Sequence, residues 1–203
     1  MLKLPKKLNG RDFLSLDEVV EYEKKYISEC ATAIALYDLT NPGPHDEISE
    51  IDVLSLYALN AFGPRPRFDP IDYMWDFREN IPPLIRPVTK TLVEELSKEE
   101  YDEQIEMLSY ALRRVEEVKY FGEVSTSKLI HRLRPNIMPI ADSKVRKWFG
   151  RSFDKWETYL QAVYYYVTEE NTLECLLTVQ KALPIRLPIL RIWDIILWQN
   201  TPD

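Results

Sequence analysis

Proline outnumbers glycine in this chain by 14 residues to five, and that ratio limits the folds open to it. Tight β-hairpins depend on residues at positive φ, which glycine adopts most easily, whereas prolines mostly mark where helices begin and end. A fold of many short strands is therefore disfavoured. Because 45% of the 203 residues are hydrophobic, the chain can fill one sizeable core. We predict a compact all-α domain over residues 1–203, with a two-lobed arrangement of the same helices as the alternative.

Capping residues and apolar residues at helical spacing locate the individual helices. Ser97 and Glu100 form a capping box at the start of one of them. The same signals predict helices over residues 17–39, 51–62, 98–120, 125–132, 142–149, 153–168, 173–182 and 187–199. Between residues 69 and 96 the prolines permit only short helices.

The last predicted helix, over residues 187–199, is apolar on nearly every side, so we expect it to lie in the core. Trp193 and Trp198 are predicted core residues on this helix. Arg191 and Asp194 lie three positions apart on it, and we expect the two to pair with each other.

Two cysteines and two histidines exclude sites that need several sulfur or nitrogen ligands. Cys30 and Cys175 cannot supply a disulfide framework, a four-cysteine iron–sulfur site or a structural zinc site. His131 is expected on the surface, and the sequence contains no phosphate-binding loop, dinucleotide-binding turn or Ser-His-Asp order. We therefore expect no metal and no cofactor. Neither a signal peptide nor a membrane-spanning run is found, which predicts a cytoplasmic protein without membrane contact.

Charge is distributed unevenly along the chain. The segment from Arg113 to Lys155 holds eleven Lys and Arg against five Asp and Glu, a local charge of +6, although the whole chain carries a formal charge of −7. Such a polarised distribution steers a polyanion toward one side of the molecule. A basic face that only interacts with solvent is the alternative.

Gly122 interrupts the pattern between two predicted helices inside this basic segment, so we expect a tight helical hairpin there. The first amides of a helix have no partner within it, and together with the helix dipole they bind phosphate regardless of base sequence. A polyanion with a phosphate backbone, such as DNA, is therefore the expected kind of partner. The phosphate contacts are assigned to Gly122, Ser125, Lys128, Arg132 and Lys144, and base stacking is assigned to Trp148 and Tyr165.

The hairpin resembles the helix-hairpin-helix motif of the DNA glycosylase superfamily, whose turn usually contains Gly, an apolar residue and Gly. Tyr120 stands at the first glycine position and Gly122 at the second. Val124 stands where the bifunctional enzymes have a lysine nucleophile, and Asp142, 18 positions later, stands where they have the catalytic aspartate. The resemblance implies a glycosylase-like fold with its hairpin segment over about 98–150. It also implies a hydrolase that releases bases through Asp142 without lyase chemistry.

A longer resemblance covers most of the chain from Tyr37 onward. It is to an uncharacterised, mostly actinobacterial family of unknown function, whose shared features look like Ser127-Lys128-Leu129, Arg134-Pro135, Pro139, Asp142 and the segment from Leu190 to Trp198. Two interpretations stay open. In one, the protein is a base-releasing enzyme that uses Asp142. In the other, Asp142 only caps a helix, and the protein is a non-catalytic module that binds DNA or binds a protein partner through its acidic remainder.

Overall fold

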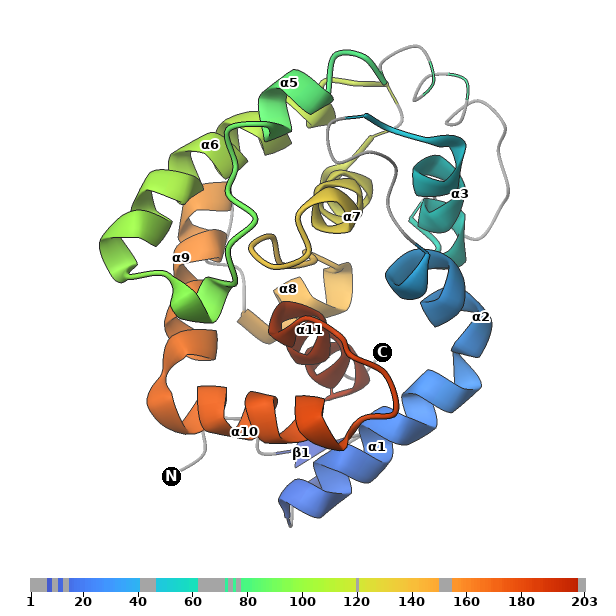
Figure 1. Ribbon diagram of the computed structural model, residues 1–203, viewed down its shortest axis with the longest axis vertical. Coiled ribbons are helices and arrows are strands. Elements are labelled where there is room, and N and C mark those ends of the chain that lie inside the picture. Colours follow the sequence, from blue (N-terminus) through green and yellow to red (C-terminus); the bar gives the residue numbers. More distant parts are fainter. Residues whose placement is uncertain are drawn as a thin grey trace.

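Two helices, α7 (Glu123–Leu133) and α11 (Ile189–Asn200), form the centre of the molecule, and the other helices enclose them (Figure 1). The structure is a computed structural model that describes residues 7–8, 11–12, 15–40, 47–61, 72, 75, 78–119, 121–149 and 155–200. Within these ranges the side chains are described except at residues 7–8, 11–12, 146–148 and 200.

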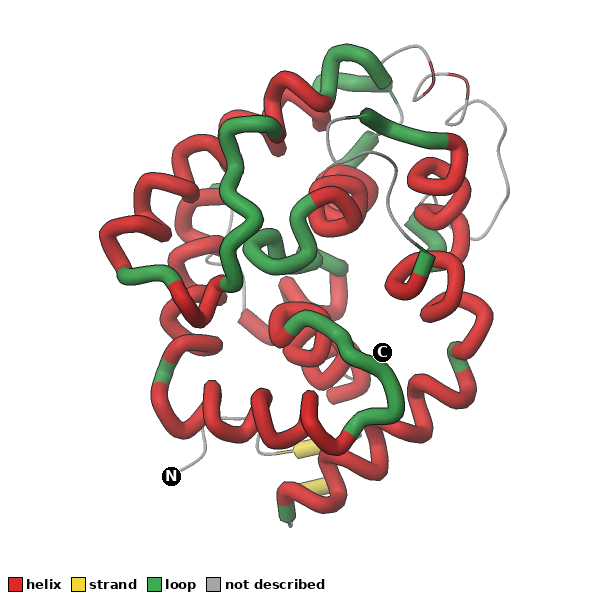
Figure 2. Tube along the Cα trace, in the orientation of Figure 1, coloured by secondary structure: helices red, strands yellow, loops and turns green. Residues whose placement is uncertain are grey.

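The enclosing helices lie on both sides of this centre, with α6 and α9 on one side and α1, α2 and α3 on the other (Figures 1 and 2). Their bounds are α1 Leu16–Glu29, α2 Ala31–Ile34, the π-helix η1 Ala35–Leu39, α3 Glu50–Ala58, α5 Pro82–Ile85, the 3₁₀ helix η2 Val93–Glu95, α6 Lys98–Glu116, α8 Ser143–Phe149, α9 Trp156–Thr168 and α10 Glu170–Ala182. The described strands, β1 Lys7–Leu8 and β2 Arg11–Asp12, form one short antiparallel pair. The rest of the described chain is helix and loop, so the predicted all-α fold is confirmed.

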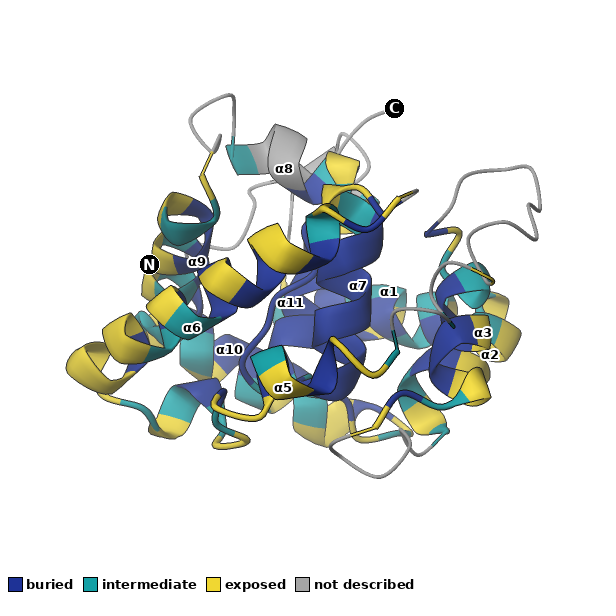
Figure 3. Cartoon of the chain, turned by 90° about the horizontal axis from the view of Figure 1, so that it is seen from above, coloured by how far each residue is buried: buried dark blue, intermediate teal, exposed yellow. Residues whose placement is uncertain are grey.

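Burial identifies α7 and α11 as the core of the fold (Figure 3). The stretch of α7 from residue 125 to its end is buried, and so is α11 from Ile189 to Leu197. α7 packs against α6 and α3, whereas α11 packs against α10, α8, α1 and α9. The prediction that the last helix lies in the core is therefore confirmed. Trp193 on this helix is 1% exposed, as expected, whereas Trp198 is 39% exposed and is not a core residue.

α6 begins where its capping box predicts. The Ser97 hydroxyl accepts a hydrogen bond from the Glu100 amide at 3.2 Å, and the Glu100 carboxylate accepts one from the Ser97 amide at 2.7 Å. The helix ends at Glu116, four residues before the predicted end. Beyond it, the chain turns so that Val118 and Phe121 enter the core, each 4% exposed.

The sequence predicts one continuous helix over residues 17–39, and the structure divides it. α1 ends at Glu29. The next residue, Cys30, caps the helix with a φ of −103° and a ψ of 23°, outside the α-helical region, and the chain continues as α2 and then η1. A π-turn inserts an extra residue into a helix and so redirects the side chains that follow. Tyr37, within η1, is 2% exposed, and its hydroxyl donates to the backbone carbonyl of Lys128 at 2.5 Å. This bond joins η1 to the central helix α7.

Two other predicted stretches are described in part. The helix predicted over residues 51–62 is α3, which ends at Ala58, and the chain then reverses at Asn60 with φ 53°. Asparagine is among the few residues other than glycine that adopt this left-handed conformation. In the proline-rich stretch the described helices are α5 and η2, and Pro82 occupies the first position of α5. No helix among the described residues is long and apolar enough to cross a membrane.

Candidate functional site

Three of the eleven basic residues counted in the segment from Arg113 to Lys155 lie on α7 or directly after it, and all three are buried. Lys128, Arg132 and Arg134 are 6%, 4% and 2% exposed. A charge that is buried and bound inside the chain does not contribute to a basic surface. The positive charge that a polyanion could reach is therefore smaller than the residue count predicts.

Arg132 binds three partners inside the fold. Its Nε donates to Asp52 Oδ1 at 3.1 Å, its Nη2 donates to Thr40 Oγ1 at 3.0 Å, and its Nη1 donates to the carbonyl of Tyr37. These bonds tie α7 to α3 and to the end of η1. The predicted phosphate contact of Arg132 is wrong in this conformation, since turning outward would leave the fully buried Asp52 carboxylate without its guanidinium.

Ser125 lies in the first turn of α7, and its hydroxyl also faces inward. It is 4% exposed and its Oγ donates to the carbonyl of Ala61 at 2.6 Å, which connects α7 to the end of α3. The side chain is therefore not available for the predicted phosphate contact.

Gly122 is the N-cap of α7 and is exposed to solvent. Its carbonyl accepts from the Thr126 amide at 2.9 Å, which begins the helix. Its φ of −97° and ψ of 177° form an extended conformation that any residue adopts, and a Cβ built there meets nothing within 4 Å. The hairpin therefore does not need glycine for its backbone angles, contrary to the expectation from the sequence, but the corner itself is open.

Asp142 stands directly before α8 and caps it. Its Oδ1 accepts from the backbone amide of Lys144 at 2.9 Å, and its Oδ2 accepts from Lys128 Nζ at 3.3 Å. Lys128 Nζ also donates to the carbonyl of Leu59 at 2.8 Å. The capping role is thus confirmed, yet the carboxylate keeps 17% exposure beside a lysine side chain that keeps 7%.

A cavity of about 260 Å³ lies beside the pair formed by Lys128 and Asp142. Its walls come from α1, α2, the end of α3, α7, α11 and the approach to α8. The lining residues are Tyr26, Cys30, Ala33, Ala58, Leu59, Asn60, Lys128, Ile140, Asp142, Arg191, Asp194 and Trp198. We call this cavity the Asp142 pocket.

Arg191, in the part of the pocket wall that α11 forms, binds two carboxylates. Its Nε and Nη2 donate to the two carboxylate oxygens of Asp38 at 2.9 and 3.3 Å, and its Nη1 donates to Asp194 Oδ2. The predicted pair of Arg191 and Asp194 is confirmed, and Asp38 from η1 completes it. Burial raises the pKa of Asp194 to about 6, against the opposing effect of Arg191.

Two further ionisable groups near this network have shifted pKa values. Glu23 on α1 is fully buried, and burial raises its pKa well above the usual range, although Arg191 acts in the other direction. Burial lowers the pKa of Lys128, while the carboxylates of Asp142 and Asp194 oppose that shift. In both groups, removal from water disfavours the charged form.

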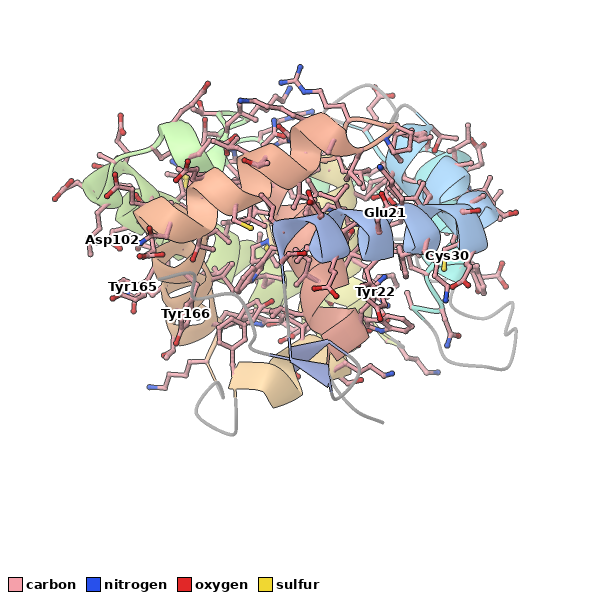
Figure 4. All side chains as sticks on the ribbon, turned by 90° about the horizontal axis from the view of Figure 1, so that it is seen from below. Glu21, Tyr22, Cys30, Asp102, Tyr165 and Tyr166 are labelled. Carbon is pink, nitrogen blue, oxygen red and sulfur yellow. The ribbon has the colours of Figure 1, made fainter. Side chains whose placement is uncertain are left out.

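The remaining predicted contact residues lie in different places. Lys144 Nζ lies 4.6 Å from the ring centre of Trp198, so this lysine borders the Asp142 pocket. Tyr165 is 60% exposed on α9, across the molecule from the pocket residue Cys30 (Figure 4). Trp148 belongs to α8, and its side chain lies outside the described part of the chain. Tyr165 therefore does not take part in the pocket.

Trp198 and Tyr26 are pocket residues that sequence reasoning misses. Their rings meet edge to face with centres 6.0 Å apart. α11 is apolar on nearly every side, so its sequence offers no polar stripe to show which face borders a cavity. The sequence therefore predicts Trp198 to be a core residue. Only the packing of α1 and α8 around α11 shows that Trp198 lines the Asp142 pocket.

His131 is a further correction, because it is buried rather than on the surface. It is 1% exposed, its Nδ1 lies 2.5 Å from the carbonyl of Met138, and its ring stacks on Tyr37. Burial lowers the pKa of His131 to about 3, so it is neutral at physiological pH. Its role is to connect α7 to the loop that leads toward Asp142.

The fold and the pocket define a class: a compact all-α protein with a buried ion-pair network beside a small cavity. The chain belongs to the family described as "Family of unknown function (DUF6308)", whose model matches residues 19–201. This membership agrees with the predicted resemblance to a family of unknown function. No curated protein matches the chain, and no solved structure does.

Proposed function

We propose that this protein binds DNA through a glycosylase-type helix-hairpin-helix and releases a base by hydrolysis at Asp142. The observation that carries the proposal is the location of Asp142. The residue that the resemblance to the glycosylase motif selects also lines a cavity, where it contacts Lys128 of α7. A cavity of about 260 Å³ with two aromatic rings in its lining is of the kind that holds one extruded base.

Asp142 is held in a way that suits charge stabilisation. Lys128 Nζ and the backbone amide of Lys144 in α8 fix its two oxygens, and the side chain stays partly accessible. When water cleaves an N-glycosidic bond, positive charge develops on the anomeric carbon, and a nearby carboxylate stabilises it or accepts a proton from the water. The water oxygen bonds to that carbon, and the base leaves with a proton. Val124 has no amine, so we expect hydrolysis without a covalent lyase step.

The open corner at Gly122 supports backbone binding next to this pocket. Gly122 is exposed at the N-terminus of the eleven-residue helix α7, where amides and the helix dipole favour an anion. Lys128 follows six residues later, about 9 Å along the same helix axis. The proposed phosphate site and the proposed base site therefore depend on one rigid element.

Asp142→Asn separates catalysis from capping, because asparagine caps a helix about as well as aspartate but carries no charge. We expect the variant to fold and to bind duplex DNA like the wild type. Release of a damaged or deaminated base from the duplex should fall at least about 100-fold, the usual loss when an acid–base group is removed. Asp102→Asn, at a more exposed carboxylate on α6 that pairs with Lys98, is the matched control and should keep the wild-type rate.

Binding is measured first, as a salt series with duplex DNA. Affinity should fall as ionic strength rises, because bound phosphates release counterions. Absence of binding at low salt contradicts the DNA proposal. Binding without release of any base supports the non-catalytic module instead, and a wild-type rate in Asp142→Asn removes the catalytic role of this residue.

A further inference from the structure

Lys128 has a hydrogen-bond donor with no acceptor in the described structure. An ammonium group has three N–H donors, and Nζ uses two of them, on the Leu59 carbonyl and on Asp142 Oδ2. The side chain is 7% exposed and lines the Asp142 pocket. The third N–H can therefore donate to a hydrogen-bond acceptor that a bound ligand places in the pocket.

The other charged groups of the pocket wall are engaged with each other. All three nitrogens of Arg191 donate to Asp38 or Asp194. Asp194 Oδ2 accepts from Arg191, and its Oδ1 is covered by neighbouring atoms, so neither oxygen is presented to a ligand. Asp142 uses one oxygen on Lys144 and the other on Lys128. Three of the five N–H groups of Arg191 are used in this network, and Lys128, next to Asp142, has one N–H beyond its two described bonds.

Aromatic side chains shape the rest of the pocket. Tyr26 and Trp198 contact each other edge to face in its wall, and Trp198 is 39% exposed. Burial raises the pKa of Tyr26 to about 12, so its hydroxyl stays protonated and is a second donor. Rings and donors together favour a planar ligand whose edge accepts hydrogen bonds.

We propose that the Asp142 pocket prefers bases that present a carbonyl oxygen to Lys128, such as hypoxanthine and uracil. Related bases that present an amino group at the same position, such as adenine and cytosine, should bind more weakly. The carbonyl oxygen accepts the third N–H of Lys128. An amino group in its place donates, so two donors face each other and the buried ammonium stays unsatisfied. The inference rests on the base-releasing function proposed above, and it identifies oxo bases as the substrate class of that function.

The test compares free bases that differ in one exocyclic group, carbonyl or amino, and in the proton on the neighbouring ring nitrogen: hypoxanthine with adenine, and uracil with cytosine. Each is titrated into the wild-type protein by calorimetry or ligand-observed NMR. The oxo member of each pair should have a dissociation constant at least about tenfold lower, the usual effect of leaving a buried charged donor unpaired. Lys128→Met keeps the bulk of the side chain and removes the donor, so the two members should then bind equally. Lys98→Met, at an exposed lysine on α6, should keep the preference.

Ala58→Phe, which places a ring in the pocket wall, should abolish binding of all four bases and shows where they bind. If Lys128→Met fails to fold, the affinities of the wild-type protein for the paired bases still test the inference, because that comparison changes only the ligand. Equal affinities, a preference for the amino bases, binding that survives Ala58→Phe, or no saturable binding of any base overturns the inference.

The titrations contain no DNA, so the two proposals fail separately. Selective binding of oxo bases by a protein that does not bind DNA contradicts only the proposed function. Binding and base release from DNA without selectivity between the paired bases contradicts only the inference about Lys128.

Discussion

At the scale of single residues, Glu23 shows how strongly burial changes a side chain of this protein. Its carboxyl is fully buried on α1, and neither oxygen has a hydrogen-bond partner among the described residues. Burial raises its pKa well above the usual range, and the opposing effect of Arg191 is smaller. The folded protein therefore favours the protonated form of Glu23, whereas the unfolded chain releases that proton at an ordinary pKa.

Glu23→Gln should change how stability depends on pH. Because the folded-state pKa is raised, the stabilising contribution of Glu23 is complete below its unfolded pKa of about 4.3 and is lost as pH rises through the folded-state pKa. Asp194, with its pKa raised to about 6, contributes with the same sign. Glutamine imitates the protonated carboxyl, so the variant should match the wild type near pH 4 and become progressively more stable than it toward pH 8. Urea unfolding at several pH values measures this difference.

Glu21→Gln is the control for this change, because Glu21 lies on the same helix with its side chain 71% exposed. It should leave the pH dependence of the wild type almost unchanged. A constant difference between Glu23→Gln and the wild type from pH 4 to 8 would show that Glu23 does not retain its proton in the folded protein.

At the scale of elements, the start of α7 is the feature that the DNA proposal depends on. Gly122 is exposed, its backbone angles suit any residue, and a Cβ there meets nothing within 4 Å. Position 122 is therefore one at which the charge can be changed with little disturbance of the hairpin.

Gly122→Asp and Gly122→Asn form a matched pair at this position. Both residues are good N-caps, so both variants should fold at least as stably as the wild type. Aspartate places a carboxylate where the phosphate is proposed to bind, whereas asparagine of the same shape does not. Both caps compete with the phosphate for the first amides of α7, and aspartate also repels it. We therefore expect Gly122→Asp to bind duplex about tenfold more weakly than Gly122→Asn at low salt, where an added repulsion of about 1.4 kcal/mol is little screened. Fluorescence anisotropy with labelled duplex measures both, and equal affinity of the two variants would exclude the hairpin as the phosphate site.

At the scale of the whole molecule, α7 and α11 hold the surrounding helices together (Figures 1 and 3). Arg132 links α7 to α3 and η1, and Arg191 links α11 to η1. The two central helices therefore cannot open unless the layer around them is displaced.

Hydrogen exchange should reveal this organisation. Amides in the buried stretches of α7 and α11 should exchange only through global unfolding and report the full free energy of unfolding. Amides in α2 and η1, which carry the exposed side chains Leu36 and Leu39, should exchange through smaller openings and earlier. Exchange of α7 before η1 in native-state mass spectrometry would contradict the central role assigned to α7.

Local signals in the sequence were enough to predict most of the helices. Capping at Ser97, the apolar face of α6 and the apolar α11 depend on neighbours within a few residues, so they can be recognised without a fold. The pair of Arg191 and Asp194 is predictable for the same reason, because its members are three positions apart on one helix. Asp142 was selected by the resemblance to the glycosylase motif, and its cavity could not be foreseen.

Tertiary structure alone decided which charges are accessible. Lys128, Arg132 and His131 are polar residues on α7, and nothing in their sequence shows that η1, α3 and the approach to α8 cover them. Their partners, among them Asp52, Tyr37 and Met138, are between seven and 95 positions away along the chain. The Asp142 pocket has the same origin, since its walls come from helices at both ends of the chain. Burial and cavities arise from contacts between distant segments, and a periodic pattern within one segment carries no information about them.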